Sequence, residues 1–214
     1  FFLLLMKASL YSYWRSSCSW RVRFALELKE IEYEYIPVHL VKDGGEQLQD
    51  KYAAVNPMKA VPTFVDSNGF QISQSGAILE YLDEVYPEKF KLLPDSPADR
   101  AIVRKLSNTI GCDIQPIQNL RILKAVGELK MEWGKRWITE GFEALEKMLE
   151  SSAGTYCFGD NITMADLFLA PQVYNANRFS VDMDKFPIIS RINAALQEHP
   201  AWKKSEPSAM PDAQ

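Results

Sequence analysis

The strongest constraint on the fold is a change of sequence pattern near residue 90. Before that point short alternating runs and helical patterns follow one another. Pro87, Pro94 and Pro97 then interrupt a stretch with little periodicity, and every regular pattern beyond it is helical. The chain is therefore expected to form an α/β domain over residues 1–89 and an all-α domain over residues 90–214.

The patterns of the first domain predict strands alternating with helices. Elements are expected over residues 31–36 (strand), 46–55 (helix), 63–65 and 70–72 (strands), and 75–85 (helix). Residues 66–69 have the composition of a tight hairpin turn. The polar, proline-containing residues 206–214 are expected to form a mobile tail.

Composition and charge exclude several classes of function. The net charge is −4, and lysine and arginine are scattered rather than striped, so no nucleic-acid partner is expected. No run approaches the ~20 apolar residues that a membrane span needs. Residues 1–5 are apolar but too short for the core of a signal peptide, and we interpret them as an exposed terminus or part of the first strand.

The three cysteines are widely spaced and form no C-x-x-C pair. Only two histidines, His39 and His199, accompany them, so neither a disulfide framework nor a metal site is expected. This usage of cysteine fits a reducing, cytosolic compartment.

Ser16, Ser17 and Cys18 stand where the first strand gives way to a helix. The first N–H groups of a helix lack partners within the helix and carry partial positive charge, so this position can hold an anion such as a thiolate. Two simpler interpretations exist: Ser16 as an N-cap and Cys18 as a small buried residue. Apolar residues at alternate positions over 20–28 also permit a strand, but alanine, leucine, glutamate and lysine favour a helix.

Residues 11–23 closely resemble the N-terminal signature of zeta-class glutathione transferases. The resemblance extends over nearly the whole chain. It continues at residues 56–63, 74–78, 114–119, 159–167 and 175–179. It implies the glutathione transferase fold, with a thioredoxin-like α/β N-terminal domain followed by an all-α C-terminal domain.

The resemblance assigns most of the glutathione contacts to the first domain. Ser16, Ser17 and Cys18 are its implied catalytic residues, and they also contact the cofactor. Further implied contacts are Gln47, Val61, Pro62, Gln74 and Ser75, and the Val61–Pro62 bond is expected to be cis. Without the resemblance, Ser75 would be interpreted as a helix cap and Gln47 as a solvated loop residue.

The second domain contributes fewer candidates. The resemblance implies that Gln115 and Asn119 contact glutathione and that Arg178 binds the substrate, with Arg21 of the first domain as the next candidate. From the residues alone, Arg178 could equally be a solvated charge or a partner of a helix C-terminus. Thr163 and Asp166 have the spacing of a capping box, which stabilises a helix and takes no part in chemistry.

The resemblance implies a cytosolic, homodimeric enzyme with glutathione as a recycled cofactor. Its expected reaction is the isomerisation of maleylacetoacetate to fumarylacetoacetate in phenylalanine and tyrosine breakdown, with a side activity on small α-halo acids. The expected partner is thus a small carboxylate substrate. The alternatives are a general glutathione-conjugating transferase, a dithiol oxidoreductase and a non-catalytic transferase-like interaction module. The dithiol oxidoreductase is disfavoured because the segment Cys18-Ser19-Trp20-Arg21 contains no second cysteine to resolve a mixed disulfide.

Overall fold

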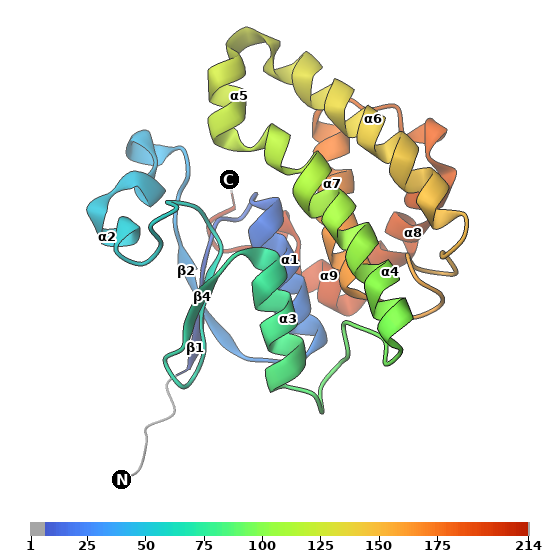
Figure 1. The fold of residues 1–214 in the computed structure, drawn as a ribbon. Coiled ribbons are helices and arrows are strands. Elements are labelled where there is room, and N and C mark those ends of the chain that lie inside the picture. Colours follow the sequence, from blue (N-terminus) through green and yellow to red (C-terminus); the bar gives the residue numbers. More distant parts are fainter. Residues whose placement is uncertain (1–6, 214) are drawn as a thin grey trace. The chain divides into compact units, whose positions relative to one another are not determined.

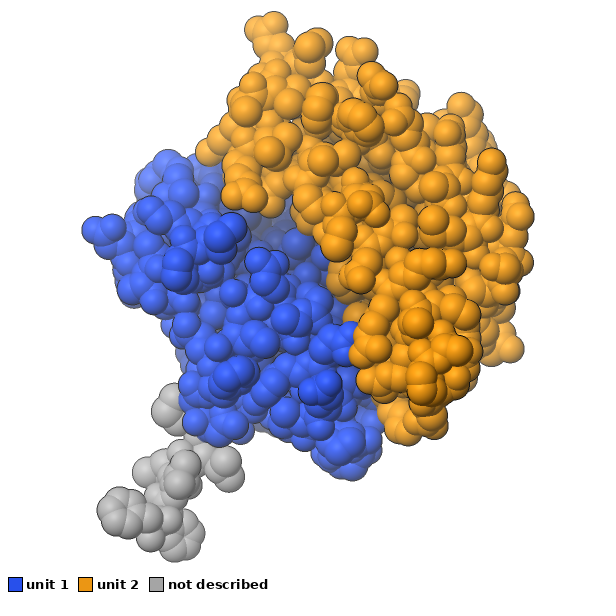
Figure 2. Space-filling view, in the orientation of Figure 1, with its two compact units in different colours: residues 1–90, 200–214 blue, residues 91–199 orange. Residues whose placement is uncertain are grey.

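The computed structural model describes residues 7–213, and the chain divides into two compact units (Figure 2). Unit 1 comprises residues 1–90 and 200–214, and unit 2 comprises residues 91–199. The apolar residues 1–5 lie outside the described part of the chain. The prediction that residues 90–214 form one helical domain is wrong for the C-terminal segment, which packs with unit 1.

Unit 1 is built on a four-stranded sheet in the order β2-β1-β3-β4 (Figure 1). The strands are β1 (Ala8–Ser12), β2 (Tyr33–Pro37), β3 (Thr63–Val65) and β4 (Gln71–Ser73). β1 runs parallel to β2 and antiparallel to β3, which forms a hairpin with β4. This mixed order confirms the expected thioredoxin-like fold of the first half of the chain.

Within residues 7–90 and 200–213, four α-helices accompany the sheet of unit 1. They are α1 (Ser17–Leu28), α2 (Asp50–Ala53), α3 (Ser75–Val85) and α9 (Pro200–Ser205). In Figure 1, α1 and α3 lie side by side on one face of the sheet and α2 lies on the other side. The predicted helix over 46–55 is wrong, because Gln49 has an extended ψ of 148° between the short 3₁₀ turn η2 (Glu46–Leu48) and α2.

Helix α1 is buried on nearly every side. α3 and α9 pack against it, and in Figure 1 it lies on one face of the sheet. Trp20, Val22, Phe24 and Leu26 are all at most 1% exposed, and so is Arg23 between them. A helix buried all round has no polar stripe, which explains why this sequence also resembles a strand.

The C-terminal segment is an ordered part of unit 1. The Trp20 indole N–H donates to the Ser205 hydroxyl over 3.0 Å, and the Trp20 and Trp202 rings meet edge to face at 5.5 Å. A 3₁₀ turn, η7 (Pro207–Ala209), follows α9. The predicted mobile tail is therefore wrong for residues 206–213, because they continue from α9 through η7 to Asp212, which accepts hydrogen bonds from the Trp14 N–H and the Tyr35 hydroxyl.

A buried carboxylate organises the β3–β4 hairpin. Asp66 is 2% exposed and accepts hydrogen bonds from the Tyr81 and Tyr86 hydroxyls at 2.6 and 2.7 Å and from the Ser67 N–H at 2.7 Å. Burial alone would raise the pKa of Asp66, but these hydrogen bonds outweigh it and lower the pKa. The network fastens the hairpin turn to α3 and to the residue that follows it.

Unit 2 is helical, as predicted. Its elements are α4 (Pro97–Asn108), the π-helical turn η3 (Thr109–Ile114), the 3₁₀ turn η4 (Pro116–Gln118), α5 (Leu120–Val126), η5 (Gly127–Leu129), α6 (Lys130–Leu149), α7 (Met164–Arg178), η6 (Met183–Lys185) and α8 (Pro187–Glu198). The capping box forms at the start of the largely buried α7. Asp166 accepts from the N–H groups of Thr163 and Cys157 at 2.8 and 2.9 Å.

Candidate functional site

The segment that carries Ser16, Ser17 and Cys18 forms the start of α1. Ser16 is the N-cap, with extended backbone, and its hydroxyl oxygen accepts from the Ser19 N–H over 3.2 Å. Accepting this bond leaves the hydroxyl proton of Ser16 available for donation. Ser17 is buried, and Cys18 is half-buried and forms no disulfide bond. The helical interpretation of this segment is thus confirmed over the strand, and Ser16 is a cap whether or not it also activates a thiol.

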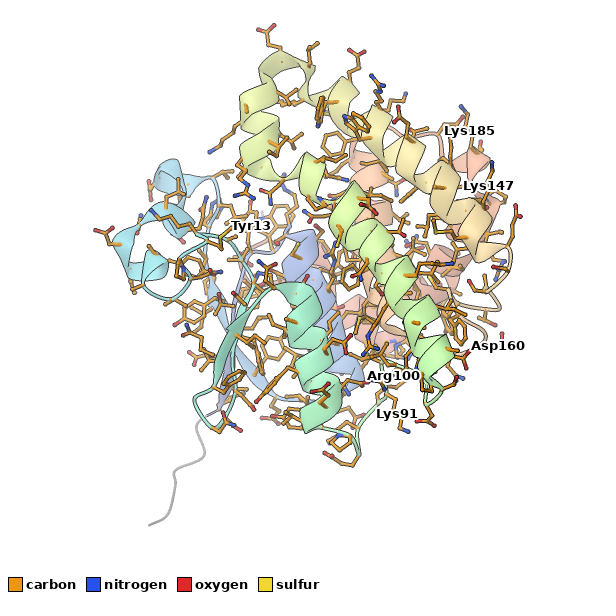
Figure 3. All side chains as sticks on the ribbon, in the orientation of Figure 1. Tyr13, Lys91, Arg100, Lys147, Asp160 and Lys185 are labelled. Atoms are coloured by element: carbon orange, nitrogen blue, oxygen red, sulfur yellow. The ribbon has the colours of Figure 1, made fainter. Side chains whose placement is uncertain are left out.

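A tight turn connects β1 to this helix start. The Ser16 N–H donates to the Tyr13 carbonyl over 2.9 Å, which closes a four-residue turn. Figure 3 labels Tyr13, which follows β1 at the end of the sheet where α1 begins. The turn therefore determines where Ser16, Ser17 and Cys18 lie relative to the sheet.

The expected cis peptide bond is present between Val61 and Pro62, immediately before β3. No hydrogen bond links the Val61 N–H or C=O to any other residue in the described part of the chain. Val61 nevertheless packs in a cluster with Tyr13, Val38 and Tyr52. Its main chain can therefore pair with an extended peptide without losing a partner within the protein.

Gln74 and Ser75 lie where β4 leads into α3. Gln74 has a φ of +74°, which is uncommon for a residue other than glycine and recurs at ligand sites. Ser75 is the first residue of α3 and is 6% exposed. Its hydroxyl accepts from Nη1 of Arg21 over 3.2 Å. Because Arg21 is only 2% exposed, its position suits support of Ser75 better than direct contact with a substrate.

Gln47 is 8% exposed, so the interpretation of this residue as a solvated loop side chain is wrong. Its amide nitrogen lies 3.4 Å from the Leu40 carbonyl, and its buried Oε1 has no partner among residues 7–213. Gly45 makes room for this amide: at a φ of +109°, a Cβ there would lie 2.7 Å from Nε2 of Gln47. A buried amide oxygen without a partner is suited to accept an N–H from a ligand.

The remaining candidates belong to unit 2. Gln115 follows the π-helical turn, and Asn119 caps α5, where its side-chain oxygen accepts from the Arg121 N–H at 3.4 Å. Arg178 is the exposed last residue of α7 and lies over the Phe179 ring at 5.4 Å. Gly134 lets that ring pack closely, since a Cβ there would lie 2.4 Å from it.

Two charged residues near the site were not predicted from the sequence. Arg23 and Asp212 both bind the turn at Tyr13 and Trp14, although Asp212 lies 198 residues away from Trp14. For Arg23 a signal existed, because an arginine between Val22 and Phe24 in a buried pattern needs internal acceptors. For Asp212 there was none, since the polar composition of its segment favours solvent.

The described residues give no indication of a metal site, a membrane-spanning helix or a disulfide bond. Over residues 7–213, no group of three or more histidine, cysteine, aspartate or glutamate side chains could hold a metal ion. Within the same range no helix is long and apolar enough to cross a membrane. Cys18, Cys112 and Cys157 form no disulfide bonds.

Comparison with known proteins matches both units to one family. Residues 6–84 match the glutathione S-transferase N-terminal domain and residues 138–204 match the C-terminal domain. The maleylacetoacetate isomerase of Rattus norvegicus is 54% identical over 207 residues, covering 96% of this chain and 95% of its own length.

Solved structures agree with the sequence matches. A bacterial maleyl pyruvate isomerase, described as a zeta-class glutathione S-transferase, superposes with a TM-score of 0.91 at 41% identity, covering 96% of this chain and all of its own. A maleylacetoacetate isomerase from Methylobacterium extorquens AM1, solved with bound malonate and glutathione, gives a TM-score of 0.90 at 32% identity, covering 96% and 99%.

Proposed function

The chain belongs to the glutathione S-transferase family, in its zeta class, and we propose that it isomerises maleylacetoacetate to fumarylacetoacetate with glutathione as cofactor. The observation that carries this proposal is the 54% identity to a maleylacetoacetate isomerase over 96% of the chain. The relative solved with glutathione and malonate supports both a glutathione site and a carboxylate substrate.

The residues of unit 1 fit glutathione at three points. The start of α1 offers helix N–H groups and the Ser16 hydroxyl to a thiolate. The Val61 main chain has an N–H and a C=O without partners among the described residues, which suits the peptide backbone of the cofactor. The start of α3, with Ser75, suits the α-carboxylate of the γ-glutamyl end.

The other glutathione contacts complete this assignment. Gln47 accepts an N–H of the cofactor through its buried Oε1, and Gln74 assists Ser75. Pro62 fixes the direction of the chain at Val61. We assign Gln115 and Asn119 as further contacts from unit 2, on the strength of the family resemblance.

Glutathione, when bound, would supply a thiolate for addition to the cis double bond of the substrate. Addition makes this carbon–carbon bond single, so that it can rotate, and elimination of the thiolate then gives the trans isomer. The protein has to hold that sulfur ionised and keep one end of the substrate fixed. Ser16 donates a hydrogen bond to the sulfur, and the helix start adds positive potential, so the ionised form is favoured. Ser17 is the alternative donor, and Cys18 adjusts the environment of the sulfur.

Arg178 anchors the substrate carboxylate in this proposal. A guanidinium can hold a carboxylate through two parallel hydrogen bonds, which fixes one end of the molecule while the other rotates. The same anchor suits small α-halo acids such as dichloroacetate, and we propose displacement of chloride from them as a side activity. A cytosolic location and a homodimer are part of the proposal by family analogy.

The test is an isomerase assay on maleylacetone with and without glutathione. We expect turnover to the trans isomer only when glutathione is present, and no net consumption of glutathione. Fast conjugation of an aromatic halide without isomerisation would instead indicate a general conjugating transferase. Retention on immobilised glutathione without turnover of either substrate would indicate a non-catalytic module.

A further inference from the structure

The turn between β1 and α1 is held by two charged side chains of unit 1, one from α1 itself and one from the C-terminal segment. It carries the chain from Ser12 to the N-cap Ser16 and is closed by the bond from the Ser16 N–H to the Tyr13 carbonyl. Any shift of this turn moves the first residues of α1. Misplacement by about 1 Å can cost ~10²-fold in rate at a reacting centre.

Arg23 binds the turn from within α1. Its Nη1 donates to the Tyr13 carbonyl at 3.2 Å and to the Ser12 hydroxyl at 3.1 Å, and its Nη2 donates to the Trp14 carbonyl at 3.0 Å. Its Nε donates to the Ser205 carbonyl at 3.0 Å. Burial lowers the pKa of Arg23 to about 10, so the guanidinium remains charged at neutral pH.

Asp212 binds the same turn from the C-terminal segment. Its Oδ2 accepts from the Trp14 N–H at 3.1 Å, and its Oδ1 accepts from the Tyr35 hydroxyl at 2.6 Å. The two backbone groups of Trp14 are therefore held by opposite charges, the N–H by a carboxylate and the C=O by a guanidinium. The peptide group that joins Tyr13 to Trp14 is likewise held at both of its polar atoms, the C=O by Arg23 and the N–H by Asp212.

The C-terminal segment has other contacts within unit 1, so it does not need the hydrogen bond between Asp212 and Trp14 in order to pack there. Ser205 is already held by Trp20 and Arg23, and Trp202 packs on Trp20. The Tyr35 hydroxyl also ties Asp212 to the sheet. The distinct effect of the Asp212–Trp14 bond is therefore on the turn and on the residues that follow it.

We propose that Asp212 is a positioning residue for the activation of glutathione. With Arg23 it fixes the turn that sets the Ser16 hydroxyl and the start of α1 against the cofactor sulfur. The proposal deepens the proposed function and rests on it, because it concerns the same glutathione site. Asp212 does not itself contact the reacting atoms.

Three variants of the full-length chain test the proposal. Asp212→Ala removes both hydrogen bonds, and Asp212→Asn retains an oxygen that can accept from the Trp14 N–H. Tyr35→Phe is the matched control, because it removes the other partner of Asp212 and leaves the bond to Trp14. The measurements are amide exchange at Trp14, thiolate absorbance of bound glutathione against pH, and kcat and KM for maleylacetone.

We expect the Trp14 amide to exchange faster in Asp212→Ala. The pKa of the bound glutathione thiol should rise, with roughly a tenfold loss of kcat and little change of KM for maleylacetone. Asp212→Asn should recover most of both losses, and Tyr35→Phe should leave the thiol titration and kcat close to those of the wild type, although its melting temperature falls.

Two results would overturn the positioning role. One is an unchanged thiol titration and kcat in Asp212→Ala despite faster exchange at Trp14. The other is equal losses in Asp212→Ala and Tyr35→Phe, which would show general docking of the C-terminal segment. A wild-type protein that lowers the thiol pKa but does not isomerise maleylacetone refutes the isomerase assignment alone. A wild-type protein that does not lower the thiol pKa refutes both proposals.

Discussion

Arg21 of α1 donates a hydrogen bond from Nη1 to the Ser75 hydroxyl of α3 over 3.2 Å, and both residues are buried. A hydroxyl that accepts from a guanidinium has its own proton directed elsewhere. Ser75 is thereby oriented as a donor at the start of α3. The bond also couples the helix that begins at the proposed thiolate site to the helix that begins at the proposed carboxylate site.

Ser75→Ala should weaken glutathione binding by about 1.5–3 kcal/mol, the range for a hydrogen bond to a charged group. This corresponds to roughly a ten- to hundredfold rise in Kd, measurable by titration calorimetry. Ser73→Ala on the adjacent strand β4 is the control and should leave Kd close to that of the wild type. Equal affinities for wild type and Ser75→Ala would assign the γ-glutamyl carboxylate to other residues.

Ser16→Ala should raise the pKa of the glutathione thiol in the binary complex, because a donor to the charged form is lost. The loss of the N-cap should also destabilise the fold by about 0.5–2 kcal/mol. Thiolate absorbance against pH and thermal unfolding measure the two effects separately. A shifted titration in Ser17→Ala, with an unchanged one in Ser16→Ala, would transfer the role to Ser17.

Cys18→Ala should retain isomerisation, because glutathione brings its own thiol to the reaction. A change of KM for maleylacetone is expected, with kcat within roughly an order of magnitude of the wild type. Cys112→Ala, which removes an exposed thiol of unit 2, is the matched control. Complete loss of turnover in Cys18→Ala, with intact folding and glutathione binding, would make Cys18 a required catalytic group.

Arg178→Ala should weaken the binding of carboxylate substrates by about 1.5–3 kcal/mol and leave glutathione affinity nearly unchanged. Arg178→Lys keeps the charge but loses the bidentate hydrogen-bond geometry, so we expect a KM between those of the wild type and Arg178→Ala. Arg136→Ala is the control, because Arg136 is an exposed arginine of α6 paired with Glu140. If steady-state kinetics of Arg178→Ala match those of the wild type, Arg178 is a solvated charge.

Asp66→Asn should change how stability depends on pH in the acid range. Because the pKa of Asp66 is lower in the folded protein than in the unfolded chain, its ionised form stabilises the fold above the unfolded value of 3.8. That stability is lost as the pH falls from about 4 through the folded pKa. Urea unfolding at a series of pH values should show a smaller acid-side loss in Asp66→Asn, and identical slopes for both proteins would contradict the assignment.

Sequence patterns correctly predicted the helices and strands whose bounds are determined by residues close together in the chain. Helix α3 has the bounds expected from the spacing of Ile78, Leu79 and Leu82, which form its buried face. The helix expected over 46–55 failed because Gln49 adopts an extended backbone that the composition did not indicate. For α1 the pattern was ambiguous because its surroundings bury nearly every face.

The residues of the candidate site likewise divide into those with a local sequence signal and those that depend on contacts between distant parts of the chain. Ser16 and Ser75 were identifiable because a helix start has a local signature, and the family resemblance added Val61 and Gln47. The contact between Asp212 and Trp14 was not identifiable, since it joins residues 198 apart and no spacing rule connects them. Tertiary hydrogen bonds of this kind depend on topology, which local sequence patterns do not specify.

Unit 1 is built from two segments of the chain that are separated by the whole of unit 2, and this has a consequence for biosynthesis. Residues 91–199 must be made between its two parts, which takes on the order of ten seconds at ~5–20 residues per second. During that interval Arg23 lacks its Ser205 acceptor and the Trp14 N–H lacks Asp212. The start of α1 therefore reaches its final geometry after synthesis of the helical unit, so that a nascent chain halted within residues 91–199 is not expected to activate glutathione.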